Sequence, residues 1–247
     1  MFEPSQLEKL LFFDIETAGQ KATYSELPEK MQSLWSARSE ILRGHLGEKY
    51  PDNKGKSDSE LFELKAGLQA EFGRIVCISM GMISFEDGIP VGKIVSYSGE
   101  DEVEIIEKAF KAMTKAKKTG AKLCGHNIKR FDVPYLCKRA FIHKLNIPEL
   151  LQVWDKKPWE TSIVDTTDSW SFGAWQEGFA SLDLLATVLG VESPKDDIKG
   201  DQVHQAFYSG QIERIATYCN KDVVTLMQIA LTLSGLNQIE KSDIRIQ

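Results

Sequence analysis

The hydrophobic pattern of this chain changes repeatedly between a strand period and a helix period, and this feature most constrains its fold. Apolar runs at residues 74–83 and 91–97 flank the turn-forming pair Asp87-Gly88, which predicts an antiparallel hairpin. The elements expected after it alternate in type: a helix at 101–118, a strand at 122–127, a helix opening near Pro134 and a strand at 163–166. Alternation of this kind predicts an α/β fold in which later strands join the sheet in parallel.

Two further regions complete the expected core. The apolar run from Leu10 to Phe13 predicts a strand that lies near the hairpin and ends at Asp14. The final third of the chain is expected to be helical, at residues 181–189, 202–208 and 211–233. In the last helix, apolar residues recur every three or four positions, so one stripe of it should pack on the core.

Residues 18–73 are too many for a simple connection between neighbouring strands. A structureless loop of this length is uncommon in a compact domain, so the segment should carry structure of its own. Helices are expected at 27–46 and 58–72, joined by an exposed link at 49–56. We therefore expect a single domain over residues 1–236, with a helical insertion at about 18–73 and a C-terminal tail at 237–247.

Composition limits the classes of protein to be considered. The 247 residues carry a net charge of −6 and are 42% hydrophobic, which is typical of a soluble globular protein and argues against strong non-specific adhesion to nucleic acid. No run of about 18 apolar residues and no signal sequence is visible, so we expect a cytoplasmic protein without a membrane partner. The cysteines lack Cys-x-x-Cys spacing and are expected to be reduced packing thiols. Nothing in the sequence indicates the oligomeric state.

The first of three acidic motifs is Asp14-Ile15-Glu16. Residues two apart in a strand point to the same face, so these carboxylates can lie together at the end of an apolar strand. Asp-x-Glu spacing alone is weak evidence, because it recurs at Asp58-Ser59-Glu60 in a polar helix start. Two solvated residues at a strand end are the simpler interpretation of this motif taken by itself.

The second motif pairs Tyr218 with Asp222, four residues apart on one face of the expected last helix. This spacing also recurs by chance, at Tyr97 and Asp101. Taken alone, it is equally typical of a boundary tyrosine beside a surface aspartate.

The third motif is more specific, because Asn127, Phe131 and Asp132 fix three positions directly after an expected strand. A corner between a strand and a helix is a common place for functional side chains. The alternative is that Asp132 caps the helix that opens near Pro134. Capping and metal binding do not exclude each other.

Along the chain, the motif of Asp14 and Glu16 comes first, that of Asn127 to Asp132 follows, and that of Tyr218 and Asp222 comes last. In this chain order and on these elements, the three motifs resemble those of the DEDD 3′-5′ exonuclease superfamily, and the tyrosine is typical of its DEDDy branch. Within that branch, residues 125–132 look most like the proofreading exonuclease domain of family B DNA polymerases, in a stand-alone bacterial form. The resemblance extends over half to two-thirds of the chain, through residues 164–166, 181–186, 199–203 and 215–223.

The resemblance implies an RNase H-like α/β fold with a mixed five-stranded sheet, three strands antiparallel and two parallel, flanked by helices. It also implies two divalent cations, Mg²⁺ or Mn²⁺, because all the ligands are oxygens. Asp14, Glu16 and Asp222 would hold the first cation, with Asp14 bridging, and Asp132 would serve the second. The neutral Tyr218 would orient the attacking water.

The substrate contacts expected around this site are Thr17, Asn127, Lys129 and Phe131. Phe131 would stack on a base, or alternatively belong to the core. Asn127 would contact phosphate, or alternatively cap the turn. Lys129 would also contact phosphate, or alternatively be a solvated side chain.

The expected function is removal of nucleotides from the 3′ end of single-stranded DNA by two-metal-ion phosphodiester hydrolysis. Two alternatives remain open: a 3′-5′ exoribonuclease, and a catalytically weak nucleic-acid-binding protein on the same fold. At 247 residues we expect no room for a polymerase. Any coupling to replication or repair would then need a separate partner.

Overall fold

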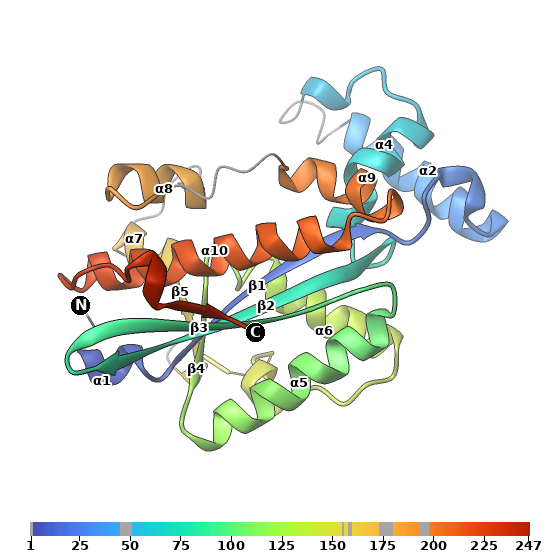
Figure 1. The fold of residues 1–247 in the computed structure, drawn as a ribbon. Coiled ribbons are helices and arrows are strands. Elements are labelled where there is room, and N and C mark those ends of the chain that lie inside the picture. The colour runs from blue at the N-terminus through green and yellow to red at the C-terminus, as the bar shows by residue number, and fades with distance from the viewer. Residues whose placement is uncertain (1, 45–50, 155, 158–159, 173–179, 193–197) are drawn as a thin grey trace.

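A six-stranded sheet forms the centre of the molecule (Figure 1). The computed structural model describes residues 2–44, 51–154, 156–157, 160–172, 180–192 and 198–247. The strand order is β5-β4-β1-β2-β3-β6. The strands are β1 (Leu10–Gly19), β2 (Gly73–Glu86), β3 (Ile89–Ser98), β4 (Lys122–Gly125), β5 (Ile163–Asp165) and β6 (Ile244–Ile246).

The pairing of the first five strands confirms the expected mixed sheet. Strands β1, β2 and β3 pair antiparallel, while β4 joins β1 and β5 joins β4 in parallel. The sixth strand is a difference from the five expected: β6 pairs in parallel with β3, within residues assigned above to a tail. Its three residues are too few to show a period-2 pattern, and its partner is the exposed edge of β3.

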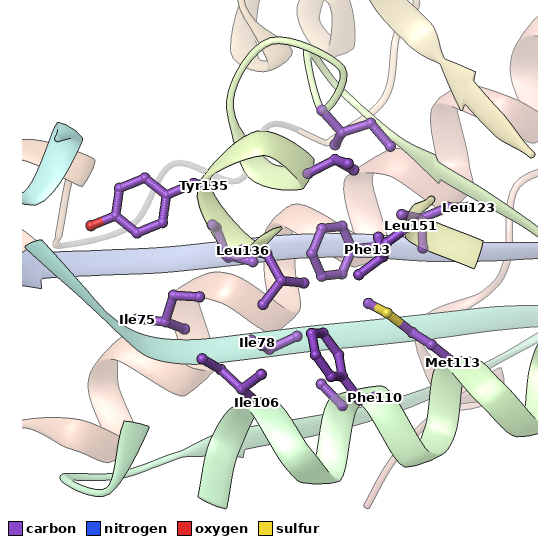
Figure 2. Packing of buried hydrophobic residues seen from close by; sticks show 14 of the residues in the cluster. Phe13, Ile75, Ile78, Ile106, Phe110, Met113, Leu123, Tyr135, Leu136 and Leu151 are labelled. Carbon is purple, nitrogen blue, oxygen red and sulfur yellow. The ribbon is translucent and has the colours of Figure 1, made fainter. Parts of the chain in front are cut away.

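Helices cover both faces of this sheet. One face carries α10 (Ile212–Leu233), and the other carries α5 (Glu102–Lys118) and α6 (Asp132–Ile142) (Figure 1). Phe12 and Phe13, adjacent in β1, point to these opposite faces and are both fully buried. Figure 2 shows the second face, where side chains from the sheet meet those of α5 and α6; the labelled residues include Phe13, Ile78, Phe110, Met113 and Leu136.

Strand β1 is longer than the apolar run predicts, and it continues through the acidic motif to Gly19. Its second half is held by β2, whose backbone pairs with every residue from Phe12 to Gly19. A bulge interrupts this register between Glu16 and Thr17. Backbone pairing with a neighbouring strand therefore overrides the low strand preference of the acidic residues, an effect that a single sequence does not reveal.

The insertion forms a small helical unit with its own apolar cluster. It contains η1 (Tyr24–Glu26), α2 (Glu29–Arg43), η2 (Pro51–Asn53), α4 (Asp58–Lys65) and η3 (Ala66–Leu68). The expected helices are present but shorter, and residues 45–46 of the first lie outside the described residues. Trp35 is fully buried between the rings of Phe62 and Phe72, and its Nε1 donates to the Asp58 carbonyl at 2.8 Å.

Helix α9 (Val203–Tyr208) fastens the start of this insertion to the rest of the domain. The backbone N–H of Gly19 donates to His204 Nδ1 at 3.0 Å, and His204 Nε2 donates to the Ala22 carbonyl at 3.0 Å. The Tyr208 hydroxyl donates to the Gly19 carbonyl at 2.8 Å. Three side-chain hydrogen bonds thus hold the chain where it leaves the sheet.

The described residues also form three short α-helices, α1 (Pro4–Leu7), α7 (Thr166–Ser171) and α8 (Leu182–Val188), and the 3-10 helices η4 (Glu149–Leu151), η6 (Gly200–Gln202) and η7 (Lys241–Asp243). Helix α7 was not expected, because its six polar-rich residues carry no helical apolar stripe. In the described part of the chain, no helix has the length and apolar character needed to cross a membrane.

Candidate active site

The second half of β1 supplies the first two carboxylates of the site. Asp14 and Glu16 share the face of the sheet that α10 covers, whereas Phe13 and Ile15 point to the opposite face. Glu16 is only 8% exposed, and Asp14 is half-buried. The strand therefore presents two acidic groups to a largely water-excluded space beneath the helix.

Helix α10 brings further groups to the same space. Cys219 donates an S–H hydrogen bond to Asp14 Oδ2 at 3.3 Å, and one ligand atom from each of Asp14, Glu16 and Cys219 lies within 4.8 Å of the others. Asp222 is buried close enough to raise the pKa of Asp14 and of Glu16 through charge repulsion. The structure thus brings together three of the four expected metal-binding carboxylates from β1 and α10, with one thiol that was not expected.

Two features that the sequence interpretation missed hold α10 close to the strands. A Cβ at Gly81 of β2 would lie 2.7 Å from Val223 Cγ1, so only glycine permits this close packing. Asn220 is the second feature: its Oδ1 accepts a hydrogen bond at 2.9 Å from Ser79, which lies opposite Asp14 in the β1–β2 register. Both residues fix the helix directly beside the carboxylates.

Asp132 supplies the fourth carboxylate, from the first residue of α6. Its Oδ1 accepts a hydrogen bond from the backbone N–H of Ile15 at 3.3 Å, and the side chain is 4% exposed. The residue at the N-cap position is Phe131, which makes no side-chain capping bond. The carboxylate of Asp132 is therefore directed toward β1 and the other acidic groups.

The electrostatics of this cluster favour a bound cation. Burial, and then repulsion from Asp222 and the other acidic groups, raises the pKa values of Asp14 and Glu16 well above their ordinary values. Burial raises the pKa of Asp132 to about 7, even though the Ile15 amide stabilises its charged form. Among the described residues, none forms a salt bridge with Asp14, Glu16 or Asp132. A divalent cation would supply the missing positive charge, and carboxylate oxygens are the ligands that Mg²⁺ and Mn²⁺ prefer.

Tyr218 precedes Cys219 on α10 and is half-buried. Burial raises the pKa of its phenol, and the negative charges of Asp222, Glu16 and Asp14 raise it further. The hydroxyl is therefore protonated over the physiological pH range and can donate a hydrogen bond beside the acidic cluster.

The corner between β4 and α6 is organised by Asp165, a buried residue that the sequence interpretation assigned no role. Its carboxylate accepts hydrogen bonds from the backbone N–H groups of Asn127 at 2.8 Å and of Lys129 at 3.1 Å. Asn127 has a φ of 60°, a left-handed conformation that asparagine tolerates. Its buried Oδ1 has no hydrogen-bond partner among the described residues, which leaves one acceptor unsatisfied at this corner.

The other three expected substrate contacts have separate surroundings. The Lys129 ammonium lies 2.9 Å from Asp168, so its charge is partly compensated within the protein. The Phe131 ring packs against that of Tyr135 with centroids 5.4 Å apart, which is consistent with the core alternative for this residue. Thr17 is half-buried directly after the β1 bulge.

Comparison with known proteins identifies one matching family model. Residues 66–237 match a family described as "Predicted 3′-5′ exonuclease related to the exonuclease domain of PolB". The matched residues contain Asp132, Tyr218 and Asp222 but begin after Asp14 and Glu16. No curated protein matches this chain.

Among solved structures, the family B DNA polymerase from the hyperthermophilic archaeon Pyrobaculum calidifontis is similar to this chain. The sequence identity is 17% and the TM-score is 0.49. The similar region covers 92% of this chain but only 24% of the polymerase.

Proposed function

Because the chain belongs to the family of predicted 3′-5′ exonucleases related to the exonuclease domain of PolB, we propose that it hydrolyses single-stranded DNA stepwise from the 3′ end with two divalent cations. The observation that carries this proposal is the convergence of carboxylates from β1, α6 and α10 around the second half of β1.

In this proposal, Asp14, Glu16 and Asp222 hold one Mg²⁺ or Mn²⁺, and Asp132 serves the second cation. The raised pKa values of Asp14, Glu16 and Asp132 support this assignment, because a cation relieves the repulsion that contributes to them. Two such cations, when bound, supply Lewis-acid stabilisation of the charge that develops in phosphodiester hydrolysis.

Tyr218 acts in this proposal as a hydrogen-bonding group that orients the attacking water. A phenol whose pKa is raised by burial and neighbouring carboxylates is a poor general base at neutral pH. The Tyr218 hydroxyl contributes by orienting the attacking water, because a correctly positioned nucleophile avoids much of the entropic cost of the reaction.

The substrate contacts are proposed from the same region. The Asn127 amide is proposed to contact the terminal nucleotide: its Oδ1, which lacks a partner among the described residues, can accept from a sugar hydroxyl, and its Nδ2 can donate to a phosphate oxygen. Lys129 contributes positive charge beside Asn127, although its ion pair with Asp168 compensates part of that charge. Thr17 and the edge of Phe131 contact the terminal sugar and base.

The insertion at 18–73 is proposed to form one wall of the single-strand channel, or a lid over it. It leaves β1 three residues after Thr17 and returns through η3 to β2, whose Ile75 pairs with Thr17. Replacing it with a short linker should weaken DNA binding or alter length preference while metal binding persists. Unchanged DNA binding and length preference would refute this role.

The function is tested by incubating the protein with single-stranded DNA labelled at the 5′ or the 3′ end, in Mg²⁺, Mn²⁺ or EDTA. We expect a descending ladder from the 5′-labelled strand and immediate release of label from the 3′-labelled strand. EDTA, Asp14→Ala and Asp222→Ala should each abolish both products. A ladder unaffected by EDTA would refute the metal-dependent mechanism.

The same experiment distinguishes the two alternatives. RNA of the same sequence should be degraded more slowly than DNA; faster degradation of RNA would favour the exoribonuclease. Binding of DNA without any shortening, in either metal, would favour a catalytically weak binding protein.

A further inference from the structure

The thiol of Cys219 lies inside the acidic cluster, although the expected metal cage contains only oxygen ligands. Cys219 is fully buried, and its Sγ is 3.3 Å from Asp14 Oδ2. One ligand atom of each of Asp14, Glu16 and Cys219 lies within 4.8 Å of the others. The site therefore offers a soft sulfur ligand beside hard carboxylate oxygens.

These separations suit a tetrahedral cation with mixed ligands. Zinc binds thiolate sulfur at about 2.3 Å and carboxylate oxygen at about 2.0 Å, and a tetrahedral angle between such bonds separates the two atoms by about 3.5 Å. The distance of 3.3 Å between Cys219 Sγ and Asp14 Oδ2 is close to this value. Only small adjustments are needed to place both atoms around one ion.

The Glu16 carboxylate provides an independent indication of a ligand. It is 8% exposed, and in the described part of the chain burial and negative neighbours raise its pKa, with no hydrogen bond or cation to lower it. A buried carboxylate in that condition is costly unless a cation compensates its charge. Its oxygen lies within the same 4.8 Å group as the thiol of Cys219.

We propose that Asp14, Glu16 and Cys219 form a site for one thiophilic divalent cation, Zn²⁺ or Cd²⁺, whose binding excludes the Mg²⁺ or Mn²⁺ pair and stops hydrolysis. The inference rests on the proposed function only in that Asp14 and Glu16 serve both states. Binding breaks the S–H bond of Cys219, forms a sulfur–metal bond and releases the proton to solvent, without any change of oxidation state. Soft thiolate ligands shift metal preference away from Mg²⁺ and toward zinc-like ions.

The direct test is a titration of the whole protein with Cd²⁺, followed by the ultraviolet charge-transfer absorption of a cadmium–thiolate bond and by calorimetry. We expect one equivalent to bind with this absorption in the wild type. Cys219→Ser should remove the absorption and weaken Cd²⁺ binding at least tenfold, and Glu16→Gln should weaken it in the same direction. The unfolding transition of each variant verifies that it is folded.

Cys124→Ser is the matched control. Cys124 is also fully buried, but it lies in β4 and is not part of the three-ligand group. This variant should keep the absorption and bind Cd²⁺ within twofold of the wild type. Absence of the absorption in the wild type, its survival in Cys219→Ser, or its loss in Cys124→Ser would each overturn the proposed site.

Inhibition separates this inference from the proposed function. With Mn²⁺ present, Zn²⁺ should stop DNA shortening by the wild type, and Cys124→Ser should be inhibited at the same Zn²⁺ concentration. If the wild type shortens DNA but forms no cadmium–thiolate bond, the inference fails alone. If the bond forms but DNA is never shortened, the proposed function fails and the cation site stands.

Discussion

Asp132 accepts a hydrogen bond from the backbone N–H of Ile15 at 3.3 Å, at the point in β1 between the two carboxylates of Asp14 and Glu16. The bond joins the beginning of α6 to the strand across 117 positions of sequence. It fixes where the fourth carboxylate lies relative to the other three. Because this bond needs only an acceptor oxygen, the charge of the Asp132 side chain can be removed while the hydrogen bond is kept.

Asp132→Asn should separate these two roles. The amide oxygen can still accept from Ile15, but the negative charge that would serve the second cation is lost. We expect exonuclease activity to fall by at least about 100-fold, as is typical when a group that stabilises transition-state charge is removed, while the fold is retained. Asp87→Asn, at the exposed turn between β2 and β3, is the control and should keep full activity. Activity is measured as the rate of strand shortening; a change under threefold in Asp132→Asn would contradict the assignment.

The acidic cluster should make the metal-free protein less stable as the pH rises. Asp132 has a folded-state pKa of about 7, whereas a carboxyl group in an unfolded chain titrates near 4. The folded state thus holds its proton more tightly, so the resulting stabilisation is complete below about pH 4 and is lost as the pH rises through about 7. The raised pKa values of Asp14 and Glu16 act in the same direction.

Thermal unfolding in EDTA between pH 5 and 7.5 checks this sign. Asp132→Asn should show a shallower loss of stability over this range than the wild type. Saturating Mn²⁺ at pH 7.5 should stabilise the wild type, by about 2.7 kcal/mol at a hundredfold excess over Kd. The opposite result would contradict the raised pKa of Asp132: as the pH rises, the metal-free wild type would become more stable relative to Asp132→Asn.

Tyr218→Phe should lower kcat with little change in KM. The variant removes only the hydroxyl, which is expected to orient the attacking water in the reaction and not to hold the ground-state substrate. We expect a fall in kcat of at least about tenfold, with KM within twofold, from initial rates on a 5′-labelled strand. Rates like those of the wild type would refute the orienting role. Tyr208→Phe, on α9, serves as a control for the loss of a hydrogen-bonded tyrosine hydroxyl.

Gly81→Ala should disturb the site from a distance by displacing α10. The new Cβ would lie 2.7 Å from Val223 Cγ1, and overpacking of this kind typically costs about 1–3 kcal/mol. Denaturant unfolding measures the loss. Gly200→Ala is the matched control, because no atom lies within 4 Å of a Cβ at that position. Val223→Ala should partly restore stability in the Gly81→Ala background but destabilise the wild type, and simple additivity of the two changes would argue against the contact.

Much of the fold follows from local pattern, whereas its boundaries depend on tertiary pairing. The positions of the five main strands and of α10 along the chain agree with the hydrophobic periods, because these segments bury one face or both. The extension of β1 to Gly19 and the pairing of β6 depend on a neighbouring strand that the local sequence does not specify. Helix α7 is too short to show a period.

The candidate site divides in the same way. Asp14, Glu16 and Asp222 were predicted from the order of three motifs that resemble those of an exonuclease family, and the structure brings their carboxylates near one another. No recognisable spacing identifies the roles of Asp165 and Asn220, because both act on residues distant in sequence. Asp165 accepts from the backbone N–H of Asn127, and Asn220 accepts from the Ser79 hydroxyl. Cys219 was interpreted as a packing thiol because its neighbours on the helix are apolar. The carboxylate beside it belongs to Asp14 on β1, and this proximity is visible only in the folded structure.

The fastening of Gly19 to α9 limits how the insertion can move. Both backbone polar groups of Gly19 are held by α9, and His204 also binds the carbonyl of Ala22. The first residues of the insertion are therefore rigidly continuous with the strand that carries Asp14 and Glu16. If the insertion opens and closes over a substrate, its hinge has to lie beyond Ala22, so the carboxylates remain stationary while the lid moves.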